Sequence, residues 1–405
     1  MKEILKSIYP YLFLAFCFVL LLDKYAIAIP NIMLISLAVT FPFVVKKADF
    51  NKLLSKEIIL FGVLIIYILI NSSLFQDIKR DISIISKILS SLALIVLYIP
   101  IEKTEKLKKT IIASVLVGII ISLYNLYFFY MDHGEFNFAT GAIIDDVLIV
   151  DRLYIGFLCV ISIIMCIDLI GDKYKPNNKW YFASIVLSVL FVLLISSRSA
   201  ILLLLMVFFL KIIYAKKKKV YILFFLGVSI ITIIAFSFND NLKERFFYTN
   251  TTHTQKSYLE KFKQWEPRVV IWECNFRVLK NEKAIINGIG FYNTQDKLTD
   301  CYGEIIKDPT KKIYFQRERF NTHNQFLDFL LSSGVIAFLL FITIFYFLFN
   351  RNIRSFSSMA LLLSIVLFAL VESLLHRQFG AYYFGIILIL LLFDDKTKQK
   401  HKTLT

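Results

Sequence analysis

Long apolar runs separated by short polar stretches dominate the chain. Runs of roughly 16–25 apolar residues have the length at which a helix crosses a membrane. The first run follows Lys2 and Lys6, as a signal peptide would, but it lacks a small-residue cleavage site and a second run follows at once. We therefore expect it to be retained as a span. The pattern predicts twelve spans, at about 8–22, 25–45, 57–75, 82–100, 110–131, 152–170, 179–196, 199–215, 220–238, 324–349, 355–376 and 379–393.

The composition supports this membrane class. The 405 residues are 58% hydrophobic and 19% charged, and the 40 Phe and 21 Tyr suit lipid-facing and interfacial surfaces. We expect one all-α polytopic membrane domain with an inserted loop. The net charge of +16 follows from topology, and we do not interpret it as nucleic-acid binding.

The basic residues orient the spans. About half of the 46 Lys and Arg residues fall on the side of the membrane that holds the N-terminus. They are Lys2, Lys6 and the basic residues of Lys46–Glu57, Glu102–Lys109, Lys173–Lys179, Lys211–Lys219, Arg351–Arg354 and the tail Asp394–Lys402. The short loops of the other side hold only Lys24, Lys79, Arg80, Arg152, Arg198 and Arg377. Because cytoplasmic loops carry the excess of Lys and Arg, both termini are predicted to be cytoplasmic.

Two predicted extracytoplasmic segments are long: the acidic Asp132–Asp151 and the insertion Asn239–Thr322. They divide the chain into spans one to nine (1–238), a large loop (239–322), and spans ten to twelve with a tail (323–405). Within the large loop we expect helices at Ser257–Trp265 and Val269–Asn281. A turn is expected at Asn287–Gly290.

Cys274 and Cys301 share the large loop. A disulfide between them fits an oxidising extracytoplasmic compartment, although their spacing alone does not establish it.

Arginine collects on the predicted extracytoplasmic side, where recognition of phosphate would use its forked N–H donors. Arg198 lies in a polar break between two apolar runs. A helix from Arg198 to Lys216 spans about 27 Å, slightly less than the hydrocarbon thickness of about 30 Å. Arg198 is therefore expected near the outer headgroup level, where a lipid diphosphate would lie. A snorkelling side chain, or a pair with an acidic loop residue, is the structural alternative.

Other charged residues on this side have structural alternatives of their own. Arg268 opens the second loop helix. Its structural alternative is a surface salt bridge to Glu273 or another loop carboxylate. Arg152 begins a span, as an interfacial anchor also would. Glu372 and His376 are interpreted as i,i+4 neighbours on one helix face, with His376 or Arg377 as the partner of the carboxylate. For Glu372, His376 and Arg377 a structural role is favoured.

His323 is the candidate general base. It stands where the large loop re-enters the membrane, at the level predicted for Arg198. Imidazole takes up a proton near neutral pH. A single histidine at a helix start is otherwise an ordinary polar residue, so the shared level with Arg198 carries the assignment.

Three motifs resemble the O-antigen ligase and polymerase superfamily of bacterial envelope glycosyltransferases. The first, His-Asn-x-x-Leu-x-x-Leu-x-x-x-Gly, is matched by His323, Asn324, Leu327, Leu330 and Gly334. The second is Ser197-Arg198-Ser199 between two spans. The third is Arg268 and Trp272 followed by the turn Gly288-Ile289-Gly290. Their order, with one large loop before the histidine, covers nearly the whole chain.

The resemblance implies a GT-C-like membrane glycosyltransferase bundle in a bacterial inner membrane, with a periplasmic active site and no metal or other cofactor. The donor would be a glycan linked through diphosphate to undecaprenol. Arg198, Arg268 and Arg152 would bind the diphosphate, and His323 would activate an acceptor hydroxyl in an inverting displacement. Supporting roles fall to Asn324, Glu372, His376 and Arg377.

Three functions remain open from the sequence. A ligase, which we favour, would transfer the glycan to a lipid A-core sugar. A polymerase would transfer it to another lipid-linked repeat unit. A polysaccharide transporter predicts ionisable residues along the bundle interior, where the spans carry few: Lys87, Asp168, Asp328 and Glu372.

Overall fold

The computed structural model describes residues 2–22, 24–25, 28–134, 141–170, 178–215, 218–238, 266–282 and 284–394, with the single residues 176, 243 and 246. The regular elements of these residues are all helices, and no strand occurs among them. The predicted all-α class is therefore confirmed. The predicted helix Ser257–Trp265 lies outside the described residues.

A helix lies at each of the predicted apolar runs. These helices are α1 (Lys2–Val19, continued by the 3-10 turn η1, Leu20–Leu22), α2 (Ala28–Val44), α3 (Lys56–Phe75), α4 (Ile78–Tyr98), α5 (Thr104–His133), α7 (Arg152–Ile170), α8 (Asn178–Leu194), α9 (Arg198–Tyr214), α10 (Lys218–Phe238), α16 (Gln325–Asn352), α17 (Phe356–Ala369) and α18 (Gln378–Phe393). The largest departure from the predicted bounds is at α17, which ends at Ala369 instead of continuing to residue 376.

Not all of these helices have the length of a full span. Among the described residues, six helices are long and apolar enough to cross a membrane: α1 with η1, α3, α4, α5, α7 and α16. A seventh candidate is α2 with η2 (Lys47–Leu54), a pair bent by 117°. Shorter apolar helices lie at Asn178–Leu194, Phe225–Ile234, Phe356–Ala369 and Gln378–Phe393. The structure confirms a helical membrane protein, and the count of twelve spans stays a prediction.

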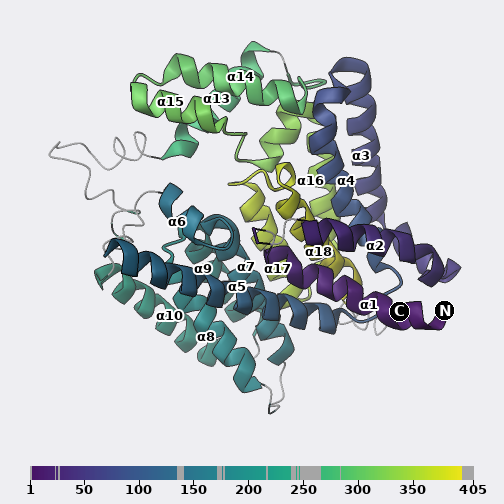
Figure 1. The fold of residues 1–405 in the computed structure, drawn as a ribbon, viewed down its shortest axis with the longest axis vertical. Coiled ribbons are helices and arrows are strands. Elements are labelled where there is room, and N and C mark those ends of the chain that lie inside the picture. Colours follow the sequence, from purple (N-terminus) through teal and green to yellow (C-terminus); the bar gives the residue numbers. More distant parts are fainter. Residues whose placement is uncertain are drawn as a thin grey trace.

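Helices α7 and α18 form the interior of the bundle. Both are predominantly apolar without a polar face, and most of their residues are buried. A helix without a polar face is stable only where neighbours or lipid cover every side. Helix α7 packs against α5, α8, α9 and α17, whereas α18 packs against α4 and α17. Figure 1 shows these two groups side by side, with α17 near the centre.

The described part of the large loop contains three helices that gather at one end of the molecule, against α4 and α16 (Figure 1). They are α13 (Pro267–Asn281), α14 (Phe291–Ile305) and α15 (Pro309–Glu318). The helix expected at Val269–Asn281 is confirmed by α13, whereas α14 and α15 were not predicted. Their stability comes from a shared small core, which includes Ile271, Leu298, Tyr302 and Phe315. No such tertiary contact is visible in a local sequence pattern.

A kink at Gly334 joins this loop to the bundle. Gly334 has a φ of +82°, and a Cβ there would lie 1.9 Å from the carbonyl oxygen of Ile286. Only glycine therefore allows α16 to bend at this close approach. The expected turn lies against the kink, where the N–H groups of Ile289 and Gly290 donate to the carbonyls of Leu331 and Ser332, each at 2.9 Å. The third and first sequence motifs thus meet in space.

A buried charge cluster lies at the other end of the bundle. The Nζ atom of Lys108 is 2.8 Å from Asp168 and 2.7 Å from Asp394. All three side chains are buried, so the two carboxylates compensate the desolvated ammonium. The cluster ties α5, α7 and the end of α18 together.

Candidate active site

Five of the predicted site residues stand at or just before the starts of helices. Arg152 is the first residue of α7, Arg198 the first of α9 and Arg268 the second of α13, while Arg377 precedes α18 and His323 comes just before Asn324, the N-cap of α16. Helix N-termini carry unpaired N–H groups and partial positive charge. Where these helix starts approach one another, the backbone adds to the attraction that the arginines exert on an anion.

Arg198 and Arg268 share one carboxylate, that of Glu266. Nη2 of Arg198 lies 2.8 Å from Oε2 of Glu266, and Nη1 of Arg268 lies 3.3 Å from Oε1. Glu266 is only 5% exposed and is the N-cap residue of α13. Each carboxylate oxygen therefore faces a different guanidinium, which brings together two arginines far apart in the sequence.

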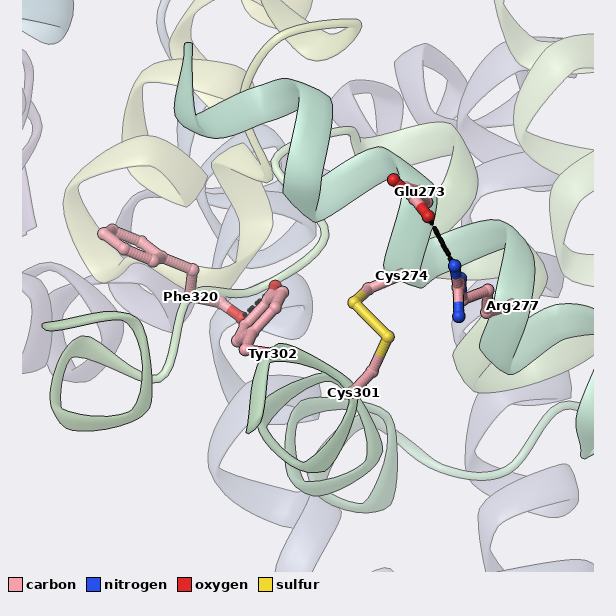
Figure 2. The surroundings of a disulfide bond; sticks show 6 residues. All are labelled: Glu273, Cys274, Arg277, Cys301, Tyr302 and Phe320. Carbon is pink, nitrogen blue, oxygen red and sulfur yellow. Dashed lines mark hydrogen bonds and ion pairs between the residues drawn. A yellow bond between two sulfur atoms is a disulfide. The ribbon is translucent and has the colours of Figure 1, made fainter. Parts of the chain in front are cut away.

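Arg268 also reaches the connection between α17 and α18. Its Nε donates to the carbonyl oxygen of Val371 at 3.2 Å. The predicted partner Glu273 is wrong, because Glu273 pairs with Arg277 one helical turn later, at 2.7 Å (Figure 2). The alternative of another loop carboxylate is correct, since Glu266 is that carboxylate. The sequence signal for it was the position of Glu266 at the helix start, beside Pro267.

His323 pairs with Glu372. Its Nδ1 lies 3.0 Å from Oε2 of Glu372, whose residue is 3% exposed. Burial raises the pKa of the Glu372 carboxyl, but His323, Arg377 and Arg268 together lower that pKa below its ordinary value of 4.5. Glu372 is therefore held as a carboxylate that accepts a hydrogen bond from the imidazole.

The interpretation of Glu372 and His376 as neighbours on one helix face is wrong. Helix α17 ends at Ala369, and His376 belongs to the short 3-10 turn η3 (Leu374–His376). Nε2 of His376 lies 2.8 Å from Asp328 on α16, which is 1% exposed. His376 is therefore not the partner of Glu372. His323, which was not predicted as its partner, takes that place. His376 instead fastens the connection to α16.

Arg377 and Arg152 lie at the adjoining helix starts. The guanidinium of Arg377 pairs with Asp151 and lies over the ring of Tyr154, 5.5 Å from its centroid. Arg377 is therefore not the direct partner of Glu372, although its charge acts on that carboxylate. Arg152 is buried, and its backbone N–H donates to Asp145 at 2.8 Å. The role of Arg152 as a diphosphate ligand stays a prediction.

Asn324 has a structural role. Its side-chain Oδ1 accepts hydrogen bonds from the N–H groups of Phe326 and Leu327, each at 3.0 Å, which caps α16. An asparagine at this position satisfies donors that would otherwise have no partner inside the helix. In the His-Asn pair of the first motif, His323 therefore stands immediately before a capped helix start.

The segment before His323 is fastened at three backbone carbonyls. Gln295 donates to the carbonyl of Arg319 at 2.7 Å, and the hydroxyl of Tyr302 donates to that of Phe320 at 3.1 Å. The amide of Asn275 donates to the carbonyl of Thr322 at 2.9 Å. This fastening holds Arg319 and His323 at positive φ, of 47° and 43°. Non-glycine residues keep such a backbone only where their surroundings impose it.

The disulfide Cys274–Cys301 lies directly beside these fastening residues. It joins α13 to α14, and each cysteine immediately precedes one of them, Asn275 and Tyr302. Figure 2 shows the bond next to the Tyr302 hydroxyl that reaches Phe320. The two helices that orient His323 are therefore covalently linked at the level where they hold its segment. The sequence alone did not establish this disulfide.

The described residues contain no group of three or more His, Cys, Asp or Glu side chains that could hold a metal ion. The chemistry of the assembled groups is that of two guanidinium forks beside an imidazole–carboxylate pair. Such a set can bind an anion and accept a proton.

Comparison with known families gives one match. Residues 183–342 match the family model described as O-antigen ligase. The match includes Arg198, Glu266, Arg268 and His323, and it ends before Glu372. It confirms the resemblance drawn from the three motifs. No curated protein matches the chain significantly.

Removing the disulfide should loosen the His323 segment. We expect the double variant Cys274→Ser/Cys301→Ser to lose about 2–4 kcal/mol of stability and to show faster amide hydrogen exchange across residues 319–323. The measurement is hydrogen-exchange mass spectrometry in nanodiscs. Cys166→Ser, a change at a buried free cysteine of α7, is the control. Native exchange rates across 319–323 in the double variant would refute the coupling.

Stability should fall in acid through Glu372. A carboxyl whose pKa is lower in the folded than in the unfolded protein stabilises the fold above the unfolded pKa. That contribution is lost as the pH falls through the folded pKa. Glu372→Gln should lower stability at neutral pH by about 1–3 kcal/mol, and its unfolding temperature should depend less on pH below 4.5, the ordinary value for this group.

The control for that measurement is Glu273→Gln, because Glu273 forms an exposed pair with Arg277 on α13. This variant should keep the acid dependence of the native protein. An unchanged stability and acid profile in Glu372→Gln would show that the buried pair does not act as described.

Proposed function

We propose that this chain, whose residues 183–342 match the O-antigen ligase family, is a membrane glycosyltransferase that takes its glycan from undecaprenyl diphosphate. The observation that carries the proposal is the sharing of Glu266 by Arg198 and Arg268, next to the pair of His323 and Glu372. One half of this arrangement suits a leaving diphosphate, and the other suits a hydroxyl that must lose its proton.

The arginine half would bind the diphosphate. Guanidinium groups that hold a carboxylate also match the geometry of phosphate oxygens, and they form two parallel hydrogen bonds where the fork allows. Glu266 compensates part of their charge and keeps both forks aligned. When the bond from the anomeric carbon to the diphosphate breaks, the electron pair stays on the diphosphate. Arg198 and Arg268 would stabilise that charge.

The histidine half would activate the acceptor. With Nδ1–H donating to Glu372, the Nε2 atom of His323 is the one that takes the proton from an acceptor hydroxyl. The oxygen then forms its bond to the anomeric carbon from the face opposite the diphosphate. A single displacement of this kind inverts the anomeric centre and uses no metal or other cofactor. Glu372 acts by orienting the imidazole and stabilising its charged form, as a carboxylate does in a catalytic triad.

We favour a lipid A-core sugar as the acceptor, which makes the protein a ligase. A polymerase, which would transfer the glycan to a second lipid-linked repeat unit, performs the same displacement at the anomeric carbon. The two functions therefore differ in the acceptor, and an assay that offers both acceptors distinguishes them.

Transport is less well supported by the ionisable residues of the spans. Lys87 donates to the carbonyl of His376 at 2.8 Å, and Asp168 belongs to the cluster with Lys108 at the other end of the bundle. Asp328 is held by His376 and lies near the start of α16. Asp328 and Asp168 thus lie toward the two ends of the bundle, and Lys87 stands midway along α4 (Ile78–Tyr98). A transport pathway is expected to place several ionisable groups near the middle of the bundle.

The charge distribution of the sequence and the family match support a proposed location. We propose a bacterial inner membrane protein with about twelve spans in a GT-C-like bundle and with both termini in the cytoplasm. The site then lies on the periplasmic side, where the donor's diphosphate reaches the headgroup level.

The arginine half is tested by conservative substitution. Arg198→Lys and Arg268→Lys should each weaken donor binding about tenfold or more, nearly as much as the alanine variants, because an ammonium cannot reproduce the fork. Binding and transfer are measured with purified protein and a lipid-linked glycan, with lipid A-core and a second lipid-linked glycan as acceptors. Arg277→Lys, at an exposed position of α13, should behave as the native protein. Native affinity and turnover in both Lys variants would exclude the paired-donor arrangement.

A further inference from the structure

A row of aromatic rings leads from the outer surface of α15 to His323. The ring centroid of Tyr314 lies 5.6 Å from that of Phe320, and that of Phe320 lies 5.6 Å from the imidazole of His323. Tyr314 is 39% exposed, and Phe320 and His323 are partly buried. The proposed catalytic base is therefore the inner end of a row that begins at solvent.

The middle ring of this row is held in place. The carbonyl of Phe320 accepts the hydrogen bond of Tyr302, and its ring packs 5.1 Å from the buried Phe315. Figure 2 shows the Phe320 ring pointing away from Tyr302 and the disulfide. Because the backbone of Phe320 is hydrogen-bonded and its ring is packed, the side chain loses little conformational freedom when a ligand covers it. At the outer end, the guanidinium of Arg317 lies 5.8 Å from the Tyr314 ring centroid.

The row meets His323 from the chain segment that immediately precedes it. Glu372 binds the Nδ1 edge of the imidazole and is the carboxylate on which Arg268 and Arg377 act. Phe320 lies three residues before His323, on the segment whose carbonyls accept hydrogen bonds from Asn275 of α13 and Tyr302 of α14. An inverting displacement places the acceptor and the leaving diphosphate on opposite faces of the anomeric carbon, so the acceptor must approach His323 from a side away from Arg198 and Arg268.

We propose that Tyr314 and Phe320 form the acceptor subsite, in which the apolar C–H face of a sugar ring stacks on these aromatic rings. The face of an aromatic ring is electron-rich and attracts the polarised C–H bonds of a pyranose, while its area excludes water. The subsite rests on the proposed function and adds the element that would select a carbohydrate acceptor and align its hydroxyl with Nε2 of His323.

The test compares ring-removing with ring-keeping variants. Tyr314→Ala and Phe320→Leu should each raise the KM for the acceptor about five- to tenfold, with donor affinity as in the native protein. Tyr314→Phe keeps the ring and should lose much less affinity than Tyr314→Ala. Tyr292→Ala, at an exposed tyrosine of α14 outside the row, is the matched control. Size-exclusion profiles establish that each variant is folded.

A direct binding measurement separates this proposal from the proposed function. Calorimetry uses two probes, a deacylated lipid A-core oligosaccharide and the donor's glycan released from its lipid. Native binding that is weakened in Tyr314→Ala and Phe320→Leu supports the subsite, even if transfer itself is absent and the proposed function fails. Transfer by the native protein, with an unchanged acceptor KM and unchanged probe binding in both variants, would overturn the subsite and leave the proposed function intact. Failure of the native protein to bind either probe would also overturn it.

Discussion

The buried carboxylate of Glu372 is the constraint on which the site depends. An isolated carboxylate in a dry interior costs several kcal/mol, so the fold must bring cationic or N–H groups to it. It does so with His323 from the end of the large loop, while the charges of Arg268 and Arg377 act on it from two further helix starts. The contacts that compensate the Glu372 carboxylate therefore link the loop helices, the start of α16 and the connection after α17.

Two buried carboxylates divide the proposed chemistry between them. Glu266 aligns two guanidinium groups that a diphosphate would use, and Glu372 orients the imidazole that would take the proton. Each carboxylate belongs to a separate segment, and Arg268 links the two, because it pairs with Glu266 and its charge also acts on Glu372. The disulfide then fixes the relation between α13, which carries Arg268, and α14, which with α13 holds the His323 segment.

The sequence was informative where the signal is local. Apolar runs predicted the helices of the bundle, and the residue types of Asn287–Gly290 predicted a turn. The contact of this turn with the kink at Gly334 was seen only in the structure. The sequence also placed Arg198, Arg268 and His323 on one side. It could not identify the carboxylates that pair with them, because Glu266 and Glu273 both stand near Arg268 in the chain and only the tertiary fold selects Glu266. Glu372 was assigned to a helix, since nothing in the apolar pattern shows that α17 stops at Ala369. Helices α14 and α15 were missed because they depend on a core that they share.

The most direct test of this account is a double-mutant cycle on turnover. Transfer rates are measured at saturating donor and acceptor for the native protein, His323→Ala, Glu372→Gln and the double variant. If Glu372 acts through His323, His323→Ala should lose about 10²–10⁴-fold, Glu372→Gln should lose less, and the double variant should be no slower than His323→Ala. Losses that multiply in the double variant, or near-native turnover in His323→Ala, would contradict the assignment of this pair as the base and its orienting carboxylate.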